Sequence, residues 1–417
     1  MLLRMALRNL FRHRWRTALT ISGIAVSTAL LIALMALLTG IYDEMAEGVT
    51  SLELGQVQIQ SAEYVERASI HHYFELSPQL QETLEEADGI DAVSGRVVAH
   101  GLIGEEEDSR IARIKGVEPR REAEVTILEE ALVQGEWLSE QLPEPDQPRQ
   151  LVLGAVVADG LGVEKGDELV VLVQAADGAL GNELLEVTGI VDTGNVLIDR
   201  QTAYMHIEDL QFITALDGMV HEVALAADLD DAPRISEQLQ TLLDQQADEP
   251  LVVRPWQEIA TDVYVMTALA EEVSWVLLLI IFAVAALGIF NTLRMSTLER
   301  RREFGVMMGV GLSRSRLAVL IVVEGVVLGL LGAVIGGIAG GLLAWGLGSW
   351  GLDLAWFTDE EAFHLMGVAF AERIFFDVSA SAILTPVIGI VVVTALCTLW
   401  PASRAISEDP RETIAGR

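Results

Sequence analysis

Four long apolar runs divide the chain. They cover residues 17–41, 273–293, 317–345 and 380–400. Each is long enough to cross the roughly 30 Å hydrocarbon core of a bilayer as a helix. The first, second and fourth runs contain no charged residue, and the third contains only Glu324. The pattern predicts an α-helical membrane protein with four transmembrane helices.

The segment between the first two runs, residues 42–272, follows a different pattern. Alternating apolar and polar positions at 55–60 predict a strand, and a serine-proline pair followed by helical spacing predicts a helix over 77–89. Between about 136 and 211, short apolar strands separated by turn signals predominate. We therefore predict a large α/β domain that carries an inserted β-rich subdomain at about 136–211.

Charge assigns these segments to opposite sides of the membrane. The net charge is −34, yet residues 1–16 contain five arginines and no acid, and residues 294–316 contain six more arginines. Residues 42–272 contain 49 acidic and 12 basic side chains. Because basic residues are retained on the cytoplasmic side, we expect both termini in the cytoplasm and the acidic domain outside. The acidic domain also excludes nucleic acid as a partner.

The remaining segments complete the expected organisation. Residues 1–16 combine apolar and basic positions at helical spacing, which predicts an amphipathic helix on the cytoplasmic membrane surface; a disordered basic tail is the alternative. The first span lacks a small-residue cleavage site, so we interpret it as a retained anchor and not as a signal peptide. Residues 346–379 form an external loop, and residues 401–417 form a cytoplasmic tail.

Motifs for catalysis are missing from the sequence. Both lysines, Lys115 and Lys165, are followed by glycine, so neither completes a phosphate-binding loop. No zinc, calcium or nucleophile motif has the required spacing. The single cysteine, Cys397, excludes an internal disulfide. We therefore expect no enzyme activity, no metal and no cofactor on this chain.

The third apolar run contains small residues at helical spacing. Such spacing lets helix backbones approach closely, either within one bundle or against a second copy. The helix-packing positions are Gly325, Gly329, Gly332, Gly336 and Gly340. Glu324 in the same run is a functional candidate because ionisable residues are rare in spans. The alternative, which we favour, is a structural partner for a nearby arginine or a helix terminus.

Residues 294–316 link the second and third spans and combine arginines with apolar side chains. We expect the second span to continue as a helix from which Leu298, Phe304, Met307 and Met308 project. Two glycines, Gly309 and Gly311, should end this helix, and a following serine could cap the next one. Such a helix suits a cleft on a partner protein, but it also suits lipid headgroups, and spacing alone does not decide between them.

The same stretch resembles the loop after the second span in permeases of the FtsX/MacB/lipoprotein-releasing (Lol) superfamily of ABC transporters. The ending at 400–414 and the opening at 7–17 are similar to that family as well. The matching positions are Asn291, Met295, Glu299, Arg300, Glu303, Phe304, Gly305, Val306, Gly311, Leu312, Ser313, Leu317, Glu324 and Gly325.

This resemblance implies a function. It implies an inner-membrane permease with a MacB-like periplasmic domain, paired with a second permease copy or a homologous permease. A separate ATPase subunit of the LolD/MacB type would bind ATP and Mg²⁺ and move the permease through a coupling helix. The implied coupling residues are Leu298, Glu299, Arg300, Arg301, Glu303, Phe304, Gly305, Met307, Met308 and Gly311.

Three substrates or outputs are compatible with the resemblance. We favour release of lipoproteins from the inner membrane to a periplasmic carrier; the alternatives are MacB-like efflux of peptides or amphiphiles and FtsX-like activation of a cell-wall hydrolase. A lipidated substrate needs an apolar surface at the external ends of the spans, open to membrane lipid. The candidate surface is Leu34, Leu37, Leu38, Ile41, Val273, Val276 and Leu277.

Overall fold

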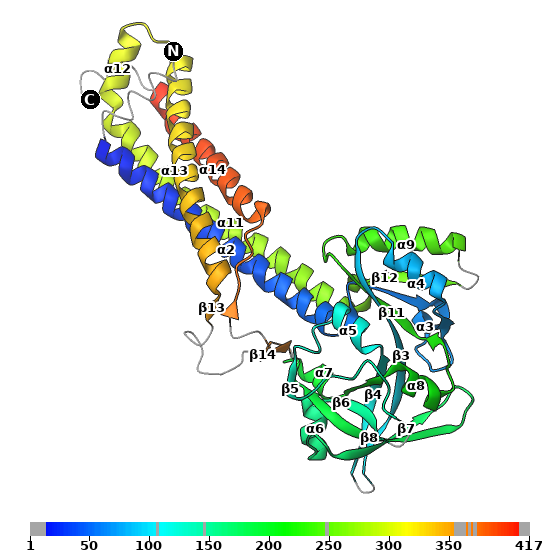
Figure 1. Ribbon diagram of the computed structural model, residues 1–417. Coiled ribbons are helices and arrows are strands. Elements are labelled where there is room, and N and C mark those ends of the chain that lie inside the picture. Colours follow the sequence, from blue (N-terminus) through cyan, green and yellow to red (C-terminus); the bar gives the residue numbers. More distant parts are fainter. Residues whose placement is uncertain are drawn as a thin grey trace. The chain divides into compact units, whose positions relative to one another are not determined.

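The computed structural model describes residues 14–105, 108–144, 147–246, 250–353, 364–365, 368–369 and 373–407 (Figure 1). The chain forms two compact units. The first comprises Met1–Asp43, Ala268–Asp359 and Glu372–Arg417, and the second comprises Glu44–Thr267 and Glu360–Ala371. The predictions for residues 1–13, for most of the loop at 346–379 and for the tail from 408 onwards lie outside the described residues.

Four long helices coincide with the four predicted spans and run alongside one another (Figure 1). They are α2 (Arg14–Val49), α11 (Thr261–Glu299), α13 (Arg314–Trp350) and α14 (Ala380–Ser407). With 28 to 39 residues, each is longer than the ~20 residues a bilayer requires. α11 begins twelve residues before the predicted span, because residues 261–272 contain no proline or glycine to stop a helix.

The glycines of α13 pack inside the chain's own helix bundle. A Cβ on Gly325 or Gly329 would meet Thr398 or Thr394 of α14. The other three packing positions face α2, where a Cβ on Gly332 would lie 2.5 Å from Ile24 Cγ2. Small residues on α13 thus allow both neighbouring helices to approach closely. The sequence left open whether these glycines pack within one bundle or against a second copy. Contacts within one bundle account for all five.

The second unit is built on a mixed sheet of ten strands among the described residues. Its main order is β12 (Leu251–Pro255), β1 (Val57–Ser61), β11 (Glu222–Ala227), β3 (Ile90–Gly104) and β4 (Ser109–Val117). Three strands from the segment predicted to be inserted follow, and a strand just before that segment ends the order. Most pairs are antiparallel, whereas β4 pairs in parallel with β9 (Thr202–His206). Strand β3 has 15 residues and also pairs with β7 (Glu168–Gln174).

The segment predicted as a β-rich subdomain is confirmed as β-rich and continues the same sheet. It contains β6 (Arg149–Gly154), β7, β8 (Leu180–Val191) and β9, with the short helices α6 (Ala155–Leu161), α7 (Val196–Asp199) and α8 (Ile207–Thr214). β5 (Leu132–Gly135) forms the sheet edge beside β8. One apolar core joins this segment to the rest of the unit, because Leu151, Val171 and Val187 lie in the same cluster as Val97 and Leu225.

Helices cover the sheet and are built as the sequence predicts. α4 (Pro78–Glu85) begins where Ser77 accepts a hydrogen bond from the backbone N–H of Leu80, at 3.2 Å. α9 (Ala232–Gln246) is amphipathic and buries its apolar side against β12 and β1. α3 (Ala62–Glu66), α5 (Pro119–Val125) and α10 (Trp256–Ile259) are shorter.

A group of charged side chains lies inside the second unit. Arg96 of β3 is fully buried and binds Glu122 of α5 through two hydrogen bonds of 2.7 and 3.0 Å. Lys115 of β4 lies 3.2 Å from Glu53 and 3.8 Å from Glu222. Glu53 belongs to η1 (Thr50–Leu54), a π-helical segment that follows α2. Buried charges of both signs therefore join η1 and α5 to three strands of the sheet.

Candidate coupling site at the arginine-rich helix

The arginine-rich segment forms a short helix of its own, α12 (Arg301–Gly309). We expected α11 to continue through it, and this prediction is wrong. α11 ends at Glu299, and Arg300 has backbone angles of −94° and 7°, outside the regular α-helix. α12 stops at Gly309, and Gly311 adopts a φ of 105°, which favours glycine. The segment is thus separated from both spans by breaks in the helix.

The start of α13 differs in detail from the expected cap. Ser313 occupies the N-cap position with extended backbone angles, as predicted, but its hydroxyl makes no capping hydrogen bond. It lies 3.4 Å from the hydroxyl of Ser315 instead. The helix therefore begins here because Gly311 turns the chain and Ser313 is extended, and the serine side chain does not satisfy a backbone N–H.

Arg300, the residue at the break, binds Glu324 inside α13. Its Nη1 lies 2.5 Å from Oε2 of Glu324, and its Nη2 lies 3.3 Å from Oε1. The exposed fractions of the two side chains are 12% and 9%. Arg300 also lies 3.3 Å from Glu303 in the first turn of α12. Glu324 therefore has a nearby arginine as a partner, which is the contact that the favoured interpretation expects.

Phe304 points into the chain and does not project from it. Only 3% of its surface is exposed, and it packs against Leu317 and Ile321 of α13 and against Ala402 and Ala405 of α14. Two further residues expected to project, Met307 and Met308, are half-buried against the same cluster, and Gly305 is buried. The prediction that Phe304 projects is wrong because α12 folds back onto the ends of α13 and α14.

The outward side of α12 carries a different set of residues. Arg302, Val306 and Val310 follow one another at intervals of four residues, and all are exposed. The exposed fraction is 48% for Val306 and 86% for Val310. We call these three residues the outer stripe. Residues four apart share a face of a helix, so the signal was present in the sequence, but apolar residues on two sides of α12 left the buried side undetermined.

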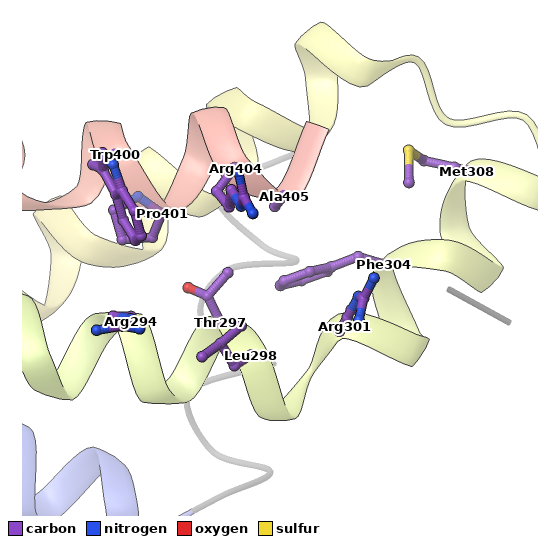
Figure 2. Close-up of a pocket in the computed structure, with 10 residues that line it drawn as sticks. All are labelled: Arg294, Thr297, Leu298, Arg301, Phe304, Met308, Trp400, Pro401, Arg404 and Ala405. Atoms are coloured by element: carbon purple, nitrogen blue, oxygen red, sulfur yellow. The ribbon is translucent and has the colours of Figure 1, made fainter. Parts of the chain in front are cut away.

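A cleft opens beside α12, between the end of α11 and the end of α14 (Figure 2). Its volume is about 550 Å³. The guanidinium of Arg294 lies 5.9 Å from the ring centre of Trp400, which in turn lies 5.3 Å from the ring of Phe290. The lining residues are Arg294, Thr297, Leu298, Arg301, Phe304, Met308, Trp400, Pro401, Arg404 and Ala405.

The candidate substrate surface combines exposed and half-buried residues. On α11, Val273, Val276 and Leu277 are 43–59% exposed. On α2, the four members are half-buried: Leu34, Leu37, Leu38 and Ile41. The hydroxyls of Tyr42 and Ser274 lie 2.6 Å apart and hold α2 against α11 at this level. The structure therefore brings the two halves of the predicted surface to neighbouring helices.

The fold and this site together define a multi-pass membrane protein with a large α/β domain and a short interhelical helix. Two family models match the chain: the MacB-like periplasmic core domain over residues 17–242, and the FtsX-like permease C-terminal domain over residues 275–410. The chain belongs to the LolC/LolE/MacB family of ABC transporter permeases.

Individual relatives are distant but cover most of the chain. It is 25% identical to the lipoprotein-releasing system transmembrane protein LolC of Neisseria meningitidis, over 95% of this chain and 93% of the relative. It is 23% identical to LolE of Haemophilus influenzae over 94% of this chain and 92% of that protein. The macrolide export ATP-binding/permease protein MacB of Escherichia coli is 25% identical over 80% of this chain and 51% of MacB.

These findings confirm the family expected from the coupling segment and the MacB-like character of the α/β domain. The relatives are permease components of ABC transporters, and the family implies an ABC ATPase as a partner. The four apolar helices and the relatives indicate a multi-pass protein of the inner membrane.

Proposed function

We propose that this chain couples ATP hydrolysis by a separate ATPase subunit to mechanical work of its α/β domain, and that this work releases lipoproteins from the inner membrane. In this proposal the ends of α11 and α14 and helix α12 face the cytoplasm, and the acidic α/β domain is periplasmic. The 14 basic residues at 1–16, 294–316 and after 400 support that orientation.

The observation that carries the proposal is the construction of α12. One side of the helix is fixed to α13 and α14 through the Phe304 cluster, and the residue before it is fixed to α13 through the Arg300–Glu324 pair. The other side presents the outer stripe to solvent. A push on an exposed surface that is tied to two spans would pass to those spans, because a close-packed cluster deforms little. The outer stripe would be the contact with the ATPase.

The contact is tested by placing a charge in the outer stripe. Val306→Asp and Val310→Asp should each reduce association with the ATPase subunit at least ten-fold, since an unpaired charge is costly in an apolar contact. Val133→Asp is the matched control, because Val133 is 63% exposed on β5, far from α12 in sequence. Co-purification and ATPase stimulation in nanodiscs are the measurements. Wild-type association of both stripe variants would reject this contact.

The substrate is tested at the candidate surface. A photo-crosslinker at Leu38 or Val276 should capture lipoprotein without ATP and lose it when ATP and Mg²⁺ are added with the ATPase subunit. A crosslinker at Leu287, 70% exposed on the same helix as Val276, is the control and should capture membrane lipid in every state. Capture of lipid alone at all three positions would favour the efflux or hydrolase-activating alternatives.

A further inference from the structure

The cleft beside α12 collects positive charge from three helices. Arg294 extends from α11, Arg301 from α12 and Arg404 from α14, and none of the ten lining residues is acidic (Figure 2). Arg294 and Arg404 are exposed, so both guanidinium groups are accessible to a ligand. Guanidinium groups bind phosphate oxygens through paired, charge-assisted hydrogen bonds. The charge and the chemistry of the lining therefore favour a phosphate-bearing anion.

The cleft also has an apolar side that continues along the spans. Leu298, Phe304, Met308 and Trp400 contribute apolar surface to the lining itself. Beyond Trp400, the neighbouring positions Leu396 and Leu399 of α14 are 60% and 53% exposed, and Leu287 of α11 is 70% exposed. α11 and α14 lie against each other here, since Cys397 Sγ lies 3.5 Å from the carbonyl oxygen of Ala286. Exposed apolar positions on both helices thus lead to the basic cleft.

We propose that this cleft binds the headgroup of an anionic phospholipid. The phosphate would lie between Arg294 and Arg404, and the acyl chains would follow the exposed apolar positions of α11 and α14. Basic pockets between membrane helices bind anionic headgroups in this way. A volume of about 550 Å³ is within the range of about 300–1,000 Å³ that is usual for small-molecule sites.

The same geometry sets the headgroup preference. Phosphatidylglycerol carries a net negative charge, whereas phosphatidylethanolamine adds an ammonium group that would enter a cleft lined by three guanidinium groups. Like charges at close range disfavour binding, so the anionic lipid is preferred. Trp400 suits the position, because tryptophan is enriched where spans meet the headgroup region.

A bound lipid would also steady α12. Arg301, Phe304 and Met308 of α12 share the cleft with Trp400 and Arg404 of α14, so one ligand contacts both helices. It would therefore favour the arrangement in which α12 rests on α14. This role concerns the inner side of α12 and is independent of the outer stripe.

The test uses the full chain without any ATPase subunit, so its result does not depend on ATP coupling. Lipid binding is measured by native mass spectrometry during titration with phosphatidylglycerol or phosphatidylethanolamine. Wild type should prefer phosphatidylglycerol about ten-fold, and Arg294→Gln or Arg404→Gln should each weaken its binding about five-fold. Arg294→Lys and Arg404→Lys should retain most of the affinity, because they keep the charge.

Arg314→Gln is the matched control, since Arg314 is exposed at the start of α13 and does not line the cleft. It should bind phosphatidylglycerol as wild type does. The proposal would be overturned if wild type bound both lipids equally, or if Arg314→Gln lost as much affinity for phosphatidylglycerol as Arg294→Gln and Arg404→Gln. If wild type does not bind phosphatidylglycerol, the lipid proposal is rejected. A separate co-purification with the ATPase subunit would then show whether the glutamine variants lose an acidic protein segment instead.

Discussion

Arg300 and Glu324 are 24 residues apart in the sequence and form a two-pronged ion pair between the start of α12 and the third turn of α13. Both side chains are largely buried. Arg300 is the residue between the end of α11 and the start of α12, so the ion pair holds the chain to α13 at the break between the two helices. The ionisable residue in this apolar span therefore has an arginine as a charged partner.

Breaking this pair should loosen α12 from α13. Glu324→Gln leaves the largely buried guanidinium of Arg300 with only the more exposed Glu303 as its carboxylate, and breaking such a pair costs about 3 kcal/mol in comparable sites. We expect faster amide hydrogen exchange throughout α12 and weaker ATPase stimulation, with the four spans still assembled. Glu303→Gln removes the more exposed partner of Arg300 and should change exchange in α12 much less.

A double variant in which the two residues swap positions provides a second test of the Arg300–Glu324 contact. Arg300→Glu combined with Glu324→Arg should recover part of the protection that either single substitution loses. Unchanged exchange in Glu324→Gln would mean that the pair does not hold α12.

The sequence was most informative where a pattern of apolar residues is long and fits a single kind of secondary structure. The four spans, the strand near residues 55–60 and the β-rich character of residues 136–211 could be predicted because runs of about 20 apolar residues, or alternating runs bounded by turns, permit few alternatives. α12 has nine residues, with Phe304 and Met308 on one side, and with Val306 and the residue after the helix, Val310, on another. Both sides are apolar, so only packing against α13 and α14 decides which one is buried.

Contacts between residues that are far apart in the sequence could not be predicted either. Glu324 could be recognised as unusual, but nothing in its neighbourhood identified Arg300 as its partner. Arg96 lies in β3, and its partners Glu122 and Glu222 come from α5 and β11. Ion pairs between distant segments depend on the register of the sheet, which local spacing does not determine.

Close packing of α13 against α2 should make one glycine intolerant of even a methyl group. A Cβ on Gly336 would lie 2.4 Å from the backbone oxygen of Ala25, which cannot move aside alone. Gly336→Ala should therefore lower the thermal midpoint of the full chain by several degrees, in line with the 1–3 kcal/mol usual for overpacking.

Gly288→Ala is the matched control on α11. Nothing lies within 4 Å of a Cβ at Gly288, and alanine favours a helix over glycine, so this variant should be as stable as wild type or slightly more so. Equal midpoints for Gly336→Ala and Gly288→Ala would show that α13 and α2 do not approach closely in the membrane.

The Arg96–Glu122 pair should be essential for the α/β domain. The exposed fractions of the two side chains are 0% and 1%, so Glu122→Ala leaves a buried guanidinium with less compensation. A loss of about 3–5 kcal/mol is expected. Pulse proteolysis in urea, applied to the full chain, would report the stability of this unit. Glu124→Gln on the same helix removes only the exposed Arg120–Glu124 pair and should cost less than about 1 kcal/mol.

Lys115 should make the stability of the α/β domain depend on pH. Burial lowers the pKa of Lys115 to about 7, although the carboxylates of Glu53 and Glu222 lie 3.2 and 3.8 Å away. The unfolded chain keeps the lysine proton up to a pKa of about 10.4, so between these two values the unfolded state binds more protons. Stability should therefore rise with pH in this window, by about 2 kcal/mol between pH 7 and pH 9.

The two lysines of the chain separate this effect from other titrations. Lys115→Met should remove the rise between pH 7 and pH 9, whereas Lys165→Met should retain it, because Lys165 is 45% exposed beside Glu136. Pulse proteolysis in urea at the two pH values, with the membrane helices held in the same nanodiscs, measures both. A rise that persists in Lys115→Met would show that another group causes it, and the prediction for Lys115 would be rejected.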